Sequence, residues 1–407
     1  MFYRIITAMI ILFAGPAFAL TMEEAVATGL KNNPQMQAFR FEEDAAKGQM
    51  QKASLPPFSN PVIEGGLSLK DRPPEEEGDR FLNNEISISQ SVEVGGQRGL
   101  RIDAATHNLA RARMEINDLE RTLTADIRDH FAQTLFFRDK VTLADEFVRL
   151  QEELSRLVSA KYEAGDVAAL EVNLVQVELA RAKRDRIAVA TAYKNALLSL
   201  KAIIGMASDA DVIPQGDLVA ALPSLPDKET LLERIPARPD IKAAEAESQR
   251  SEVLHALAKR ELIPKVTWRL FQGMDERRYE RGGSLAVEIP IFDRKQAERT
   301  EARIRASQAR IREAGVTKNA RKEIEVSYAA AASSLSELDL FKQAILGRTT
   351  ENLDLLQYAF REGKISFYDV RIAQREMIET RNAYLDALLS VQRAYNALER
   401  AIGGDLR

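Results

Sequence analysis

The 407-residue chain contains no cysteine and only three histidines, His107, His130 and His255. The lack of cysteine excludes structural disulfides, thiolate metal sites and a lipidated N-terminal cysteine. The histidines are too scattered for a metal cluster, and each is interpreted as a helix-surface residue. Because a phosphate-binding loop, a Ser/His/Asp set and a His-rich spacing are all missing as well, the sequence predicts no enzyme and no cofactor or metal site.

Long apolar runs and a surplus of basic residues are also missing. After residue 19, no stretch reaches eighteen apolar residues, so no transmembrane helix is predicted. The 57 Lys and Arg nearly balance the 61 Asp and Glu, without the basic stripe that nucleic-acid binding requires. Residues 1–19 combine Arg4, an apolar core over 5–13 and the small-x-small pattern at 17–19, which predicts a signal peptide. An uncleaved anchor is the alternative.

Glycine and proline are absent from residues 100–164 and again from 166–204. The first stretch predicts a helix about 100 Å long, at roughly 1.5 Å per residue. Its apolar residues recur every seven positions from Ile102, as in a coiled coil. In the second half of the chain, Gly315 and Gly347 interrupt a comparable helical pattern. They are candidate bends, and glycines simply tolerated within a helix are the alternative.

The chain contains an internal duplication. Residues 162–172 align without a gap with residues 360–370, and the register holds as far as Gly205 and Gly403. Since Gly165 and Gly363 each separate two long helical patterns, each copy is predicted to be a helical hairpin.

A pair of segments with period-2 alternation precedes each helical hairpin. Apolar and polar residues alternate in 60–70 and 85–94, and again in the stretches that begin at Val266 and end at Ile291. A length of about ten residues suits tilted strands that cross a membrane. The polar connections 71–84 and 274–282 would then be loops. A soluble hairpin with one wet face is the alternative.

The predicted fold class is mainly α with a transmembrane β part, in which a β-hairpin and a long α-helical hairpin are duplicated. Thr21 and Glu24 predict a capping box at the first short helix. The predicted bounds are: signal peptide 1–19; repeat 1, 20–205, with short helices 21–54, strand pair 60–94 and helical hairpin 97–205 with its tip at 165; linker 206–227; repeat 2, 228–403, with helices 228–262, strand pair 265–291 and helical hairpin 293–403 with its tip at 363; and tail 404–407.

Four strands do not close a membrane barrel, because the smallest such barrels have eight. An open edge in lipid would leave backbone groups unpaired, at several kcal/mol each. Other copies of the chain must therefore complete the barrel. Two copies would give eight strands and a filled interior, whereas three would give twelve strands and room for a channel. The helical hairpins would continue this channel as a hollow conduit.

The order of these elements resembles that of the TolC-like outer-membrane efflux proteins. The resemblance also rests on the Asn-Asn-Pro34 helix and on the Tyr-x-x-Gly165 and Phe-x-x-Gly363 turns, each followed by an acid six residues on. The run from Ile88 to Arg101 looks like the CzcC-like heavy-metal efflux branch. The resemblance implies a homotrimer in the outer membrane of a Gram-negative bacterium, with a 12-stranded β-barrel continued by a periplasmic α-helical barrel.

The same resemblance implies a function and a set of partners. The protein would be the passive exit duct of a tripartite efflux system, with a leaning towards heavy-metal cations. Its partners would be outer-membrane lipid, a periplasmic adaptor (membrane fusion) protein and an inner-membrane pump of the RND type. Type I protein secretion or drug export through the same fold remains an alternative. A secreted coiled-coil scaffold without a channel is another.

The resemblance assigns two roles to the hairpin turns. The exposed tips would meet the adaptor, and turning the chain is the alternative role of these residues. Asp369 matches a family position whose carboxylates ring the channel entrance, while Glu171 would pair with Lys364 or Arg361 to keep it narrow. Ordinary solvated charge is the alternative for both acids. The predicted tip residues are Gly165, Asp166, Val167, Ala168, Gly363, Lys364, Ile365 and Ser366.

Overall fold

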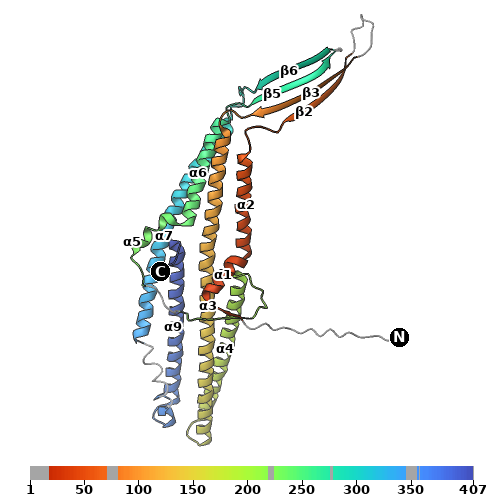
Figure 1. The fold of residues 1–407 in the computed structure, drawn as a ribbon. Coiled ribbons are helices and arrows are strands. Elements are labelled where there is room, and N and C mark those ends of the chain that lie inside the picture. Colours follow the sequence, from red (N-terminus) through yellow and green to blue (C-terminus); the bar gives the residue numbers. More distant parts are fainter. Residues whose placement is uncertain are drawn as a thin grey trace, which may run out of the picture. The chain divides into compact units, whose positions relative to one another are not determined.

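The computed structural model describes residues 18–70, 81–218, 224–275, 278–344, 355–356 and 358–406. Most of the predicted signal peptide and the candidate bend at Gly347 lie outside these residues. The chain divides into two compact units, and α2, α3 and α7, labelled in Figure 1, contribute residues to both units. One unit comprises residues 1–37, 119–235 and 320–407, and the other comprises residues 38–118 and 236–319.

The short N-terminal helices form as their caps predict. Helix α1 (Met22–Asn32) begins with the capping box, in which the Glu24 backbone N–H donates to Thr21 Oγ1 (3.3 Å) and the Thr21 N–H donates to Glu24 Oε2 (2.9 Å). Helix α2 (Pro34–Ser54) starts directly after Asn33. Because Pro34 has no N–H, it fits the first position of a helix and ends the preceding one.

The predicted linker 206–227 contains a short strand that its sequence did not indicate. Strand β1 (Phe18–Leu20) pairs in parallel with β4 (Val212–Pro214), and the Gln215 N–H donates to the Leu20 carbonyl (2.8 Å). Leu20 is fully buried. Three residues are too few for an alternation to be recognised, which is why this strand was missed.

The long helices follow the stretches that lack glycine and proline. The first hairpin consists of α3 (Gln97–Glu163) and α4 (Ala169–Ile203), and the second repeat has α7 (Gln296–Ala344) and α9 (Phe367–Ile402). Gly315 lies within α7 and does not interrupt it. Of the helices in the described ranges, none is both long and apolar enough to span a membrane. The described residues also include α5 (Lys228–Leu232), the 3-10 helix η1 (Ile235–Ala237), α6 (Pro239–Arg260) and a helical segment at 358–361 that leads into the turn at Gly363.

The two predicted strand pairs combine into one antiparallel sheet with the order β2-β3-β5-β6 (Figure 1). The strands extend further towards the hairpin turns than predicted, so the expected loop at 274–282 is mostly strand. In contrast, the last strand ends at Val287 and not at Ile291, since Pro290 has no N–H to donate to a partner strand. The strands are β2 (Val62–Lys70), β3 (Phe81–Val92), β5 (Val266–Asp275) and β6 (Arg278–Val287).

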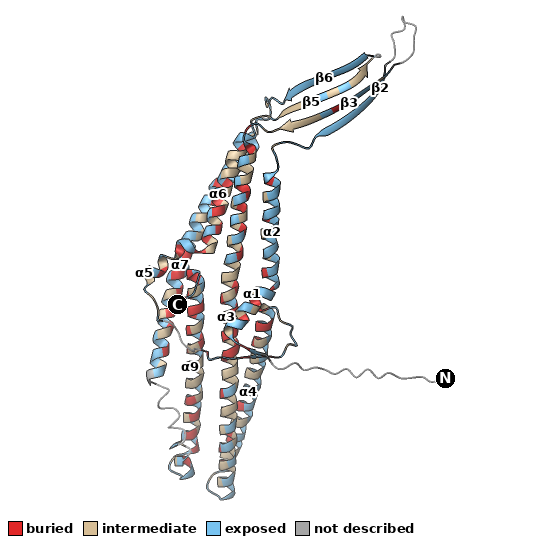
Figure 2. Ribbon diagram, in the orientation of Figure 1, coloured by how far each residue is buried: buried red, intermediate tan, exposed pale blue. Residues whose placement is uncertain are grey.

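The two faces of this sheet differ as the alternation predicts. One face carries exposed apolar side chains, such as Leu67 (77% exposed) and Leu285 (76%). On the other face, the Ser91 and Thr267 hydroxyls lie 2.7 Å apart and Arg269 forms an ion pair with Glu85. Figure 2 shows β2 and β6 as mostly exposed, and in the described sheet each has only one neighbouring strand. The duplicated β-hairpin and helical hairpin are thereby confirmed.

Candidate docking and gating site at the hairpin turns

The two hairpin turns have the same backbone structure. Gly165 and Gly363 both adopt left-handed conformations, with φ of +85° and +70°. In each turn, the glycine and the residue after it donate back to two carbonyls of the preceding helix, which is a Schellman motif. The four N···O distances are 3.0 Å (Gly165 to Tyr162), 2.8 Å (Asp166 to Lys161), 3.1 Å (Gly363 to Phe360) and 2.8 Å (Lys364 to Ala359).

Glycine is needed at these two positions because of the left-handed backbone conformation, and not because a side chain would lack space. A Cβ added at Gly165 or Gly363 would meet nothing within 4 Å. A left-handed conformation costs any other L-residue roughly 1–2 kcal/mol, so alanine would be disfavoured at both positions.

The helices that follow the two turns are capped differently. Ser366 is the N-cap of α9 and forms a capping box with Asp369, whose Oδ2 accepts from the Ser366 N–H (2.9 Å) and hydroxyl (2.7 Å). In the first copy, Ala168 occupies the N-cap of α4 and has no side chain that accepts a hydrogen bond. Glu171, the counterpart of Asp369, lies in the first turn of α4, where a negative charge is stabilised by the helix dipole. The paired acids thus have a structural role at helix ends.

The capping box also fixes the charge of Asp369. Hydrogen bonds from the Ser366 hydroxyl, and then from its backbone N–H, lower the pKa of the Asp369 carboxyl below its usual value. A lowered folded-state pKa stabilises the protein at pH values above the unfolded pKa, and this contribution is lost as the pH falls through the folded value.

The unequal caps predict opposite effects of two exchanges. Ser366→Ala should destabilise the second hairpin by about 1 kcal/mol, whereas Ala168→Ser should stabilise the first by up to a similar amount. The loss in Ser366→Ala should shrink as the pH falls through the lowered folded-state pKa of Asp369, because protonated Asp369 no longer accepts the same bonds. Hydrogen exchange of the first-turn amides, followed at pH 7 and at a series of lower pH values, would measure these changes. Equal exchange rates in Ser366→Ala and the parent at pH 7 would contradict the assigned cap.

A hydrophobic cluster joins the two turns to each other. Its buried members come from the end of α3, the start of α4 and the second turn, and they include Phe360 (4% exposed) and Val158 (0%). Val167 and Ile365 pack against this cluster and are partly buried, so the prediction that they are exposed tips is wrong. Sequence position alone placed them at the tips, whereas they pack against a cluster whose members come from both hairpins. The buried members are Leu154, Val158, Val175, Phe360, Phe367 and Val370.

The predicted gate residues lie close to this cluster without an ion pair between them. Glu171 is half-buried, while Asp369, Lys364 and Arg361 are exposed. The Lys364 ammonium lies 5.6 Å from the centre of the Tyr358 ring. Among the described residues of this single chain, Glu171 forms no salt bridge with Lys364 or Arg361. The predicted pairing of Glu171 with Lys364 or Arg361 therefore remains a prediction for contacts between neighbouring subunits.

A buried glutamine pair behind the turns was not recognised as functional from the sequence. Gln151 Nε2 donates to Gln374 Oε1 (2.9 Å), and both side chains are almost fully buried. In the register of the duplication Gln374 corresponds to Gln176, but Gln176 is exposed, so the sequence repeat did not indicate which of the two is buried. The pair fixes α3 against α9 one helical turn behind the cluster.

The described residues contain no group of three or more His, Cys, Asp or Glu side chains arranged to hold a metal ion.

Comparisons with known proteins agree with this architecture. Residues 26–206 and 233–404 match the family model described as outer membrane efflux protein. The cobalt-zinc-cadmium resistance protein CzcC of Cupriavidus metallidurans is 25% identical over 399 residues, which cover 96% of this chain and 91% of CzcC. The nickel-cobalt-cadmium resistance protein NccC of Alcaligenes xylosoxydans xylosoxydans is 27% identical over 63% of this chain and 59% of NccC.

A solved structure shows the same fold. The outer-membrane channel OprN matches with a TM-score of 0.80 and 19% identity, over 94% of this chain and 90% of OprN. The family model matches both halves of the chain, so the sequence match extends over both copies of the duplicated architecture. The chain belongs to the outer membrane efflux protein family, and its place is the outer membrane.

Proposed function

We propose that this protein is the exit duct of a tripartite efflux system and works as a homotrimer. The observation that carries the proposal is the four-stranded sheet with one exposed apolar face and single-neighbour strands at both edges. Joining β6 of one copy to β2 of the next would pair these edges and turn the apolar face towards lipid. Three copies give twelve strands, a number that leaves an open lumen.

The turns support an adaptor protein as a partner. Each Schellman turn holds short polar or small residues outward on a fixed backbone, and the cluster behind it is already packed. A periplasmic adaptor would contact this surface, and an inner-membrane pump of the RND type would supply the energy for transport. The exposed turn residues are Gly165, Asp166, Ala168, Gly363, Lys364 and Ser366.

Heavy-metal cations are the proposed substrates. CzcC and NccC are named for resistance to cobalt, zinc, cadmium and nickel, and CzcC is similar to this chain over nearly its full length. In a trimer, three ionised Asp369 carboxylates near a common axis would attract cations to the entrance. The lowered pKa of Asp369 keeps these carboxylates charged at neutral pH.

The assembly is tested by mass measurement of the mature protein in a mild detergent. We expect three chains per particle and precipitation when the detergent is removed, because the apolar sheet face needs lipid or detergent. A stable monomer in detergent-free buffer would contradict the proposal.

Replacing Asp369 should change ion selectivity in the proposed channel. Asp369→Asn removes three charges per trimer and should reduce cation preference and block by multivalent cations, most clearly at low salt, where screening is weak. Single-channel recording in planar bilayers measures both properties. Ser366→Ala is the matched control, since it disturbs the same cap and leaves the charge in place. Unchanged selectivity and block in Asp369→Asn would show that the carboxylate is ordinary surface charge.

A further inference from the structure

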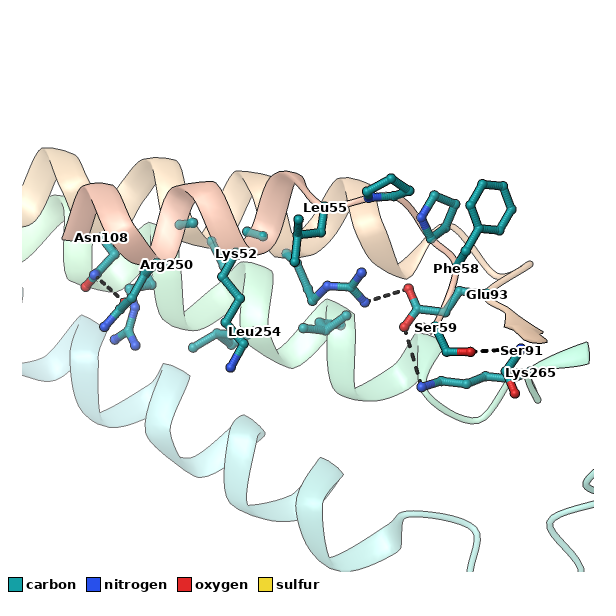
Figure 3. Close-up of a pocket in the computed structure, with 18 residues that line it drawn as sticks. Lys52, Leu55, Phe58, Ser59, Ser91, Glu93, Asn108, Arg250, Leu254 and Lys265 are labelled. Carbon is teal, nitrogen blue, oxygen red and sulfur yellow. Dashed lines mark hydrogen bonds and ion pairs between the residues drawn. The ribbon is translucent and has the colours of Figure 1, made fainter. Parts of the chain in front are cut away.

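A pocket of about 500 Å³ lies where the sheet meets the helices, within the unit formed by residues 38–118 and 236–319 (Figure 3). Its walls are the end of α2 with the segment after it, the end of β3, the start of α3, and α6. Volumes of this size are typical of small-molecule sites. The turns at 165 and 363 belong to the other unit, so the pocket is not part of the docking and gating site.

Backbone and side-chain hydrogen bonds fix the rim of the pocket. The Glu93 N–H donates to the Pro57 carbonyl (2.8 Å), and the Ser91 N–H donates to Ser59 Oγ (2.9 Å). Arg98 Nε donates to the Leu55 carbonyl (2.9 Å) at the end of α2. These bonds tie the segment after α2 to the end of β3 and to α3, so this part of the rim is fixed in the absence of a ligand.

Small side chains leave room inside, and larger apolar side chains surround the space. Ala53, Ala104 and Ala105 are buried in the walls. Leu55 is 60% exposed, and Leu254 is half-buried on α6. A ligand that fills this space would therefore cover apolar surface, which favours an apolar body.

Positive charge exceeds negative charge around the pocket. Glu93 is the carboxylate in the lining, and it is shared by two cations, Arg101 Nη1 (2.6 Å) and Lys265 Nζ (3.7 Å). Lys52 forms no ion pair among the described residues. Its side chain extends from α2 towards Leu254 (Figure 3).

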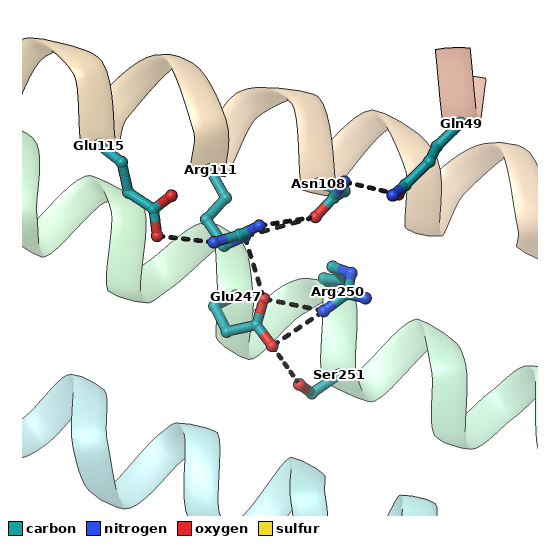
Figure 4. Close-up of polar contacts among 7 residues, drawn as sticks. All are labelled: Gln49, Asn108, Arg111, Glu115, Glu247, Arg250 and Ser251. Atoms are coloured by element: carbon teal, nitrogen blue, oxygen red, sulfur yellow. Dashed lines mark hydrogen bonds and ion pairs between the residues drawn. The ribbon is translucent and has the colours of Figure 1, made fainter. Parts of the chain in front are cut away.

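Arg250, the fourth basic residue of the lining, pairs with a carboxylate outside the lining. Glu247 pairs with Arg250 (3.0 Å) and lies 3.4 Å from Arg111 Nε, while Asn108 Oδ1 accepts from Arg111 Nη2 (3.1 Å) (Figure 4). Asn108 in turn donates to Gln49 Oε1 (2.9 Å). Arg111 has a second carboxylate partner in Glu115 (2.7 Å), so Glu247 offsets the charge of Arg250, and the network fixes the Arg250 guanidinium beside the pocket. Lys52 is thus the basic side chain of the lining whose charge no ion pair among the described residues offsets.

We propose that this pocket binds an organic anion, a molecule in which one anionic group is attached to an apolar body. The anionic group contacts Lys52 and Arg250, and the apolar body packs against Leu55 and Leu254. Ser91 in the lining shares the polar face of the sheet with Thr267, so in the proposed barrel the pocket opens towards the duct. That last placement rests on the proposed function, whereas binding itself does not.

The test uses naphthalene-1-sulfonate with the purified full-length protein in a neutral detergent, and equilibrium dialysis against protein-free micelles. Naphthalene-1-sulfonamide is the neutral match, and methanesulfonate carries the anionic group alone. We expect one sulfonate site per chain and weaker binding of both analogues. Lys52→Glu should weaken binding at least about tenfold, as expected for loss of a charge-assisted contact.

Two further variants distinguish binding at this site from a general effect of surface charge and from misfolding. Lys259→Glu makes the same charge change on the exposed end of α6 outside the lining and should bind like the parent. Lys52→Arg should retain most of the affinity. Equal binding of the sulfonamide, or unchanged binding in a folded Lys52→Glu protein, would overturn the proposal. Since dialysis needs no conduction, a failure of the duct proposal would leave this result unaffected.

Discussion

Replacing Leu67 by arginine should prevent assembly of the protein in the outer membrane. Leu67 lies near the middle of β2, on the apolar face, and its side chain is 77% exposed in the single chain. If this face meets lipid, an arginine near the bilayer midplane costs about 2–4 kcal/mol per copy, and three copies carry the change. We therefore expect little trimer in isolated outer membranes, measured by gel electrophoresis under mild conditions.

Ser68→Arg is the matched control for this substitution. Ser68 is the next residue of the same strand and points to the opposite, polar face. An arginine there remains in contact with water in the proposed duct, so assembly should be nearly normal. If both variants assembled equally well, the apolar face would not be a lipid surface.

Replacing Phe360 by alanine should loosen the hairpin turns strongly. Phe360 is 4% exposed in the cluster that joins the two turns, and Phe→Ala changes in cores typically cost about 3–5 kcal/mol. Local opening free energies control hydrogen exchange, so protection of amides around residues 358–370 should fall by about a hundredfold or more. Mass-spectrometric hydrogen exchange on the assembled protein measures this directly.

The duplication supplies an internal control. Tyr162 occupies the position of Phe360 in the first copy, but it is 49% exposed and lies outside the cluster. Tyr162→Ala should therefore change protection by less than about tenfold, because little buried area is lost. Similar losses in both variants would show that turn formation, and not the cluster, controls opening.

The sequence predicted the elements whose signals are local. Period-2 alternation around Ile86 and Val287 identified the strands, and the lack of helix breakers before Gly165 identified a helix of nearly the observed length. Both signals are local: helix breakers act on the backbone of their own segment, and alternation arises when one face of a strand is apolar. Strand ends were less accurate, because Pro290 limits pairing in a way that apolar alternation does not reveal.

The site was predicted less well because its contacts join separate hairpins. Whether Val167 and Ile365 are exposed depends on the helix opposite, and the pattern around each turn contains no information about that neighbour. The Ser366–Asp369 capping box, in contrast, was present as a local pattern of serine followed three residues later by an acid. It was missed because Asp369 was interpreted by its family position alone.

The two edge strands of the sheet, β2 and β6, bear on how many copies of the chain form the proposed barrel. The four strands alternate in direction across the sheet, so the two edge strands β2 and β6 run in opposite directions. Any copy joined edge to edge continues the antiparallel order, and a closed ring of any number of copies satisfies the backbone equally well. In the proposed barrel, strand pairing would therefore require a closed ring without determining how many chains it contains. That number must come from the angle between neighbouring copies, which side-chain packing sets.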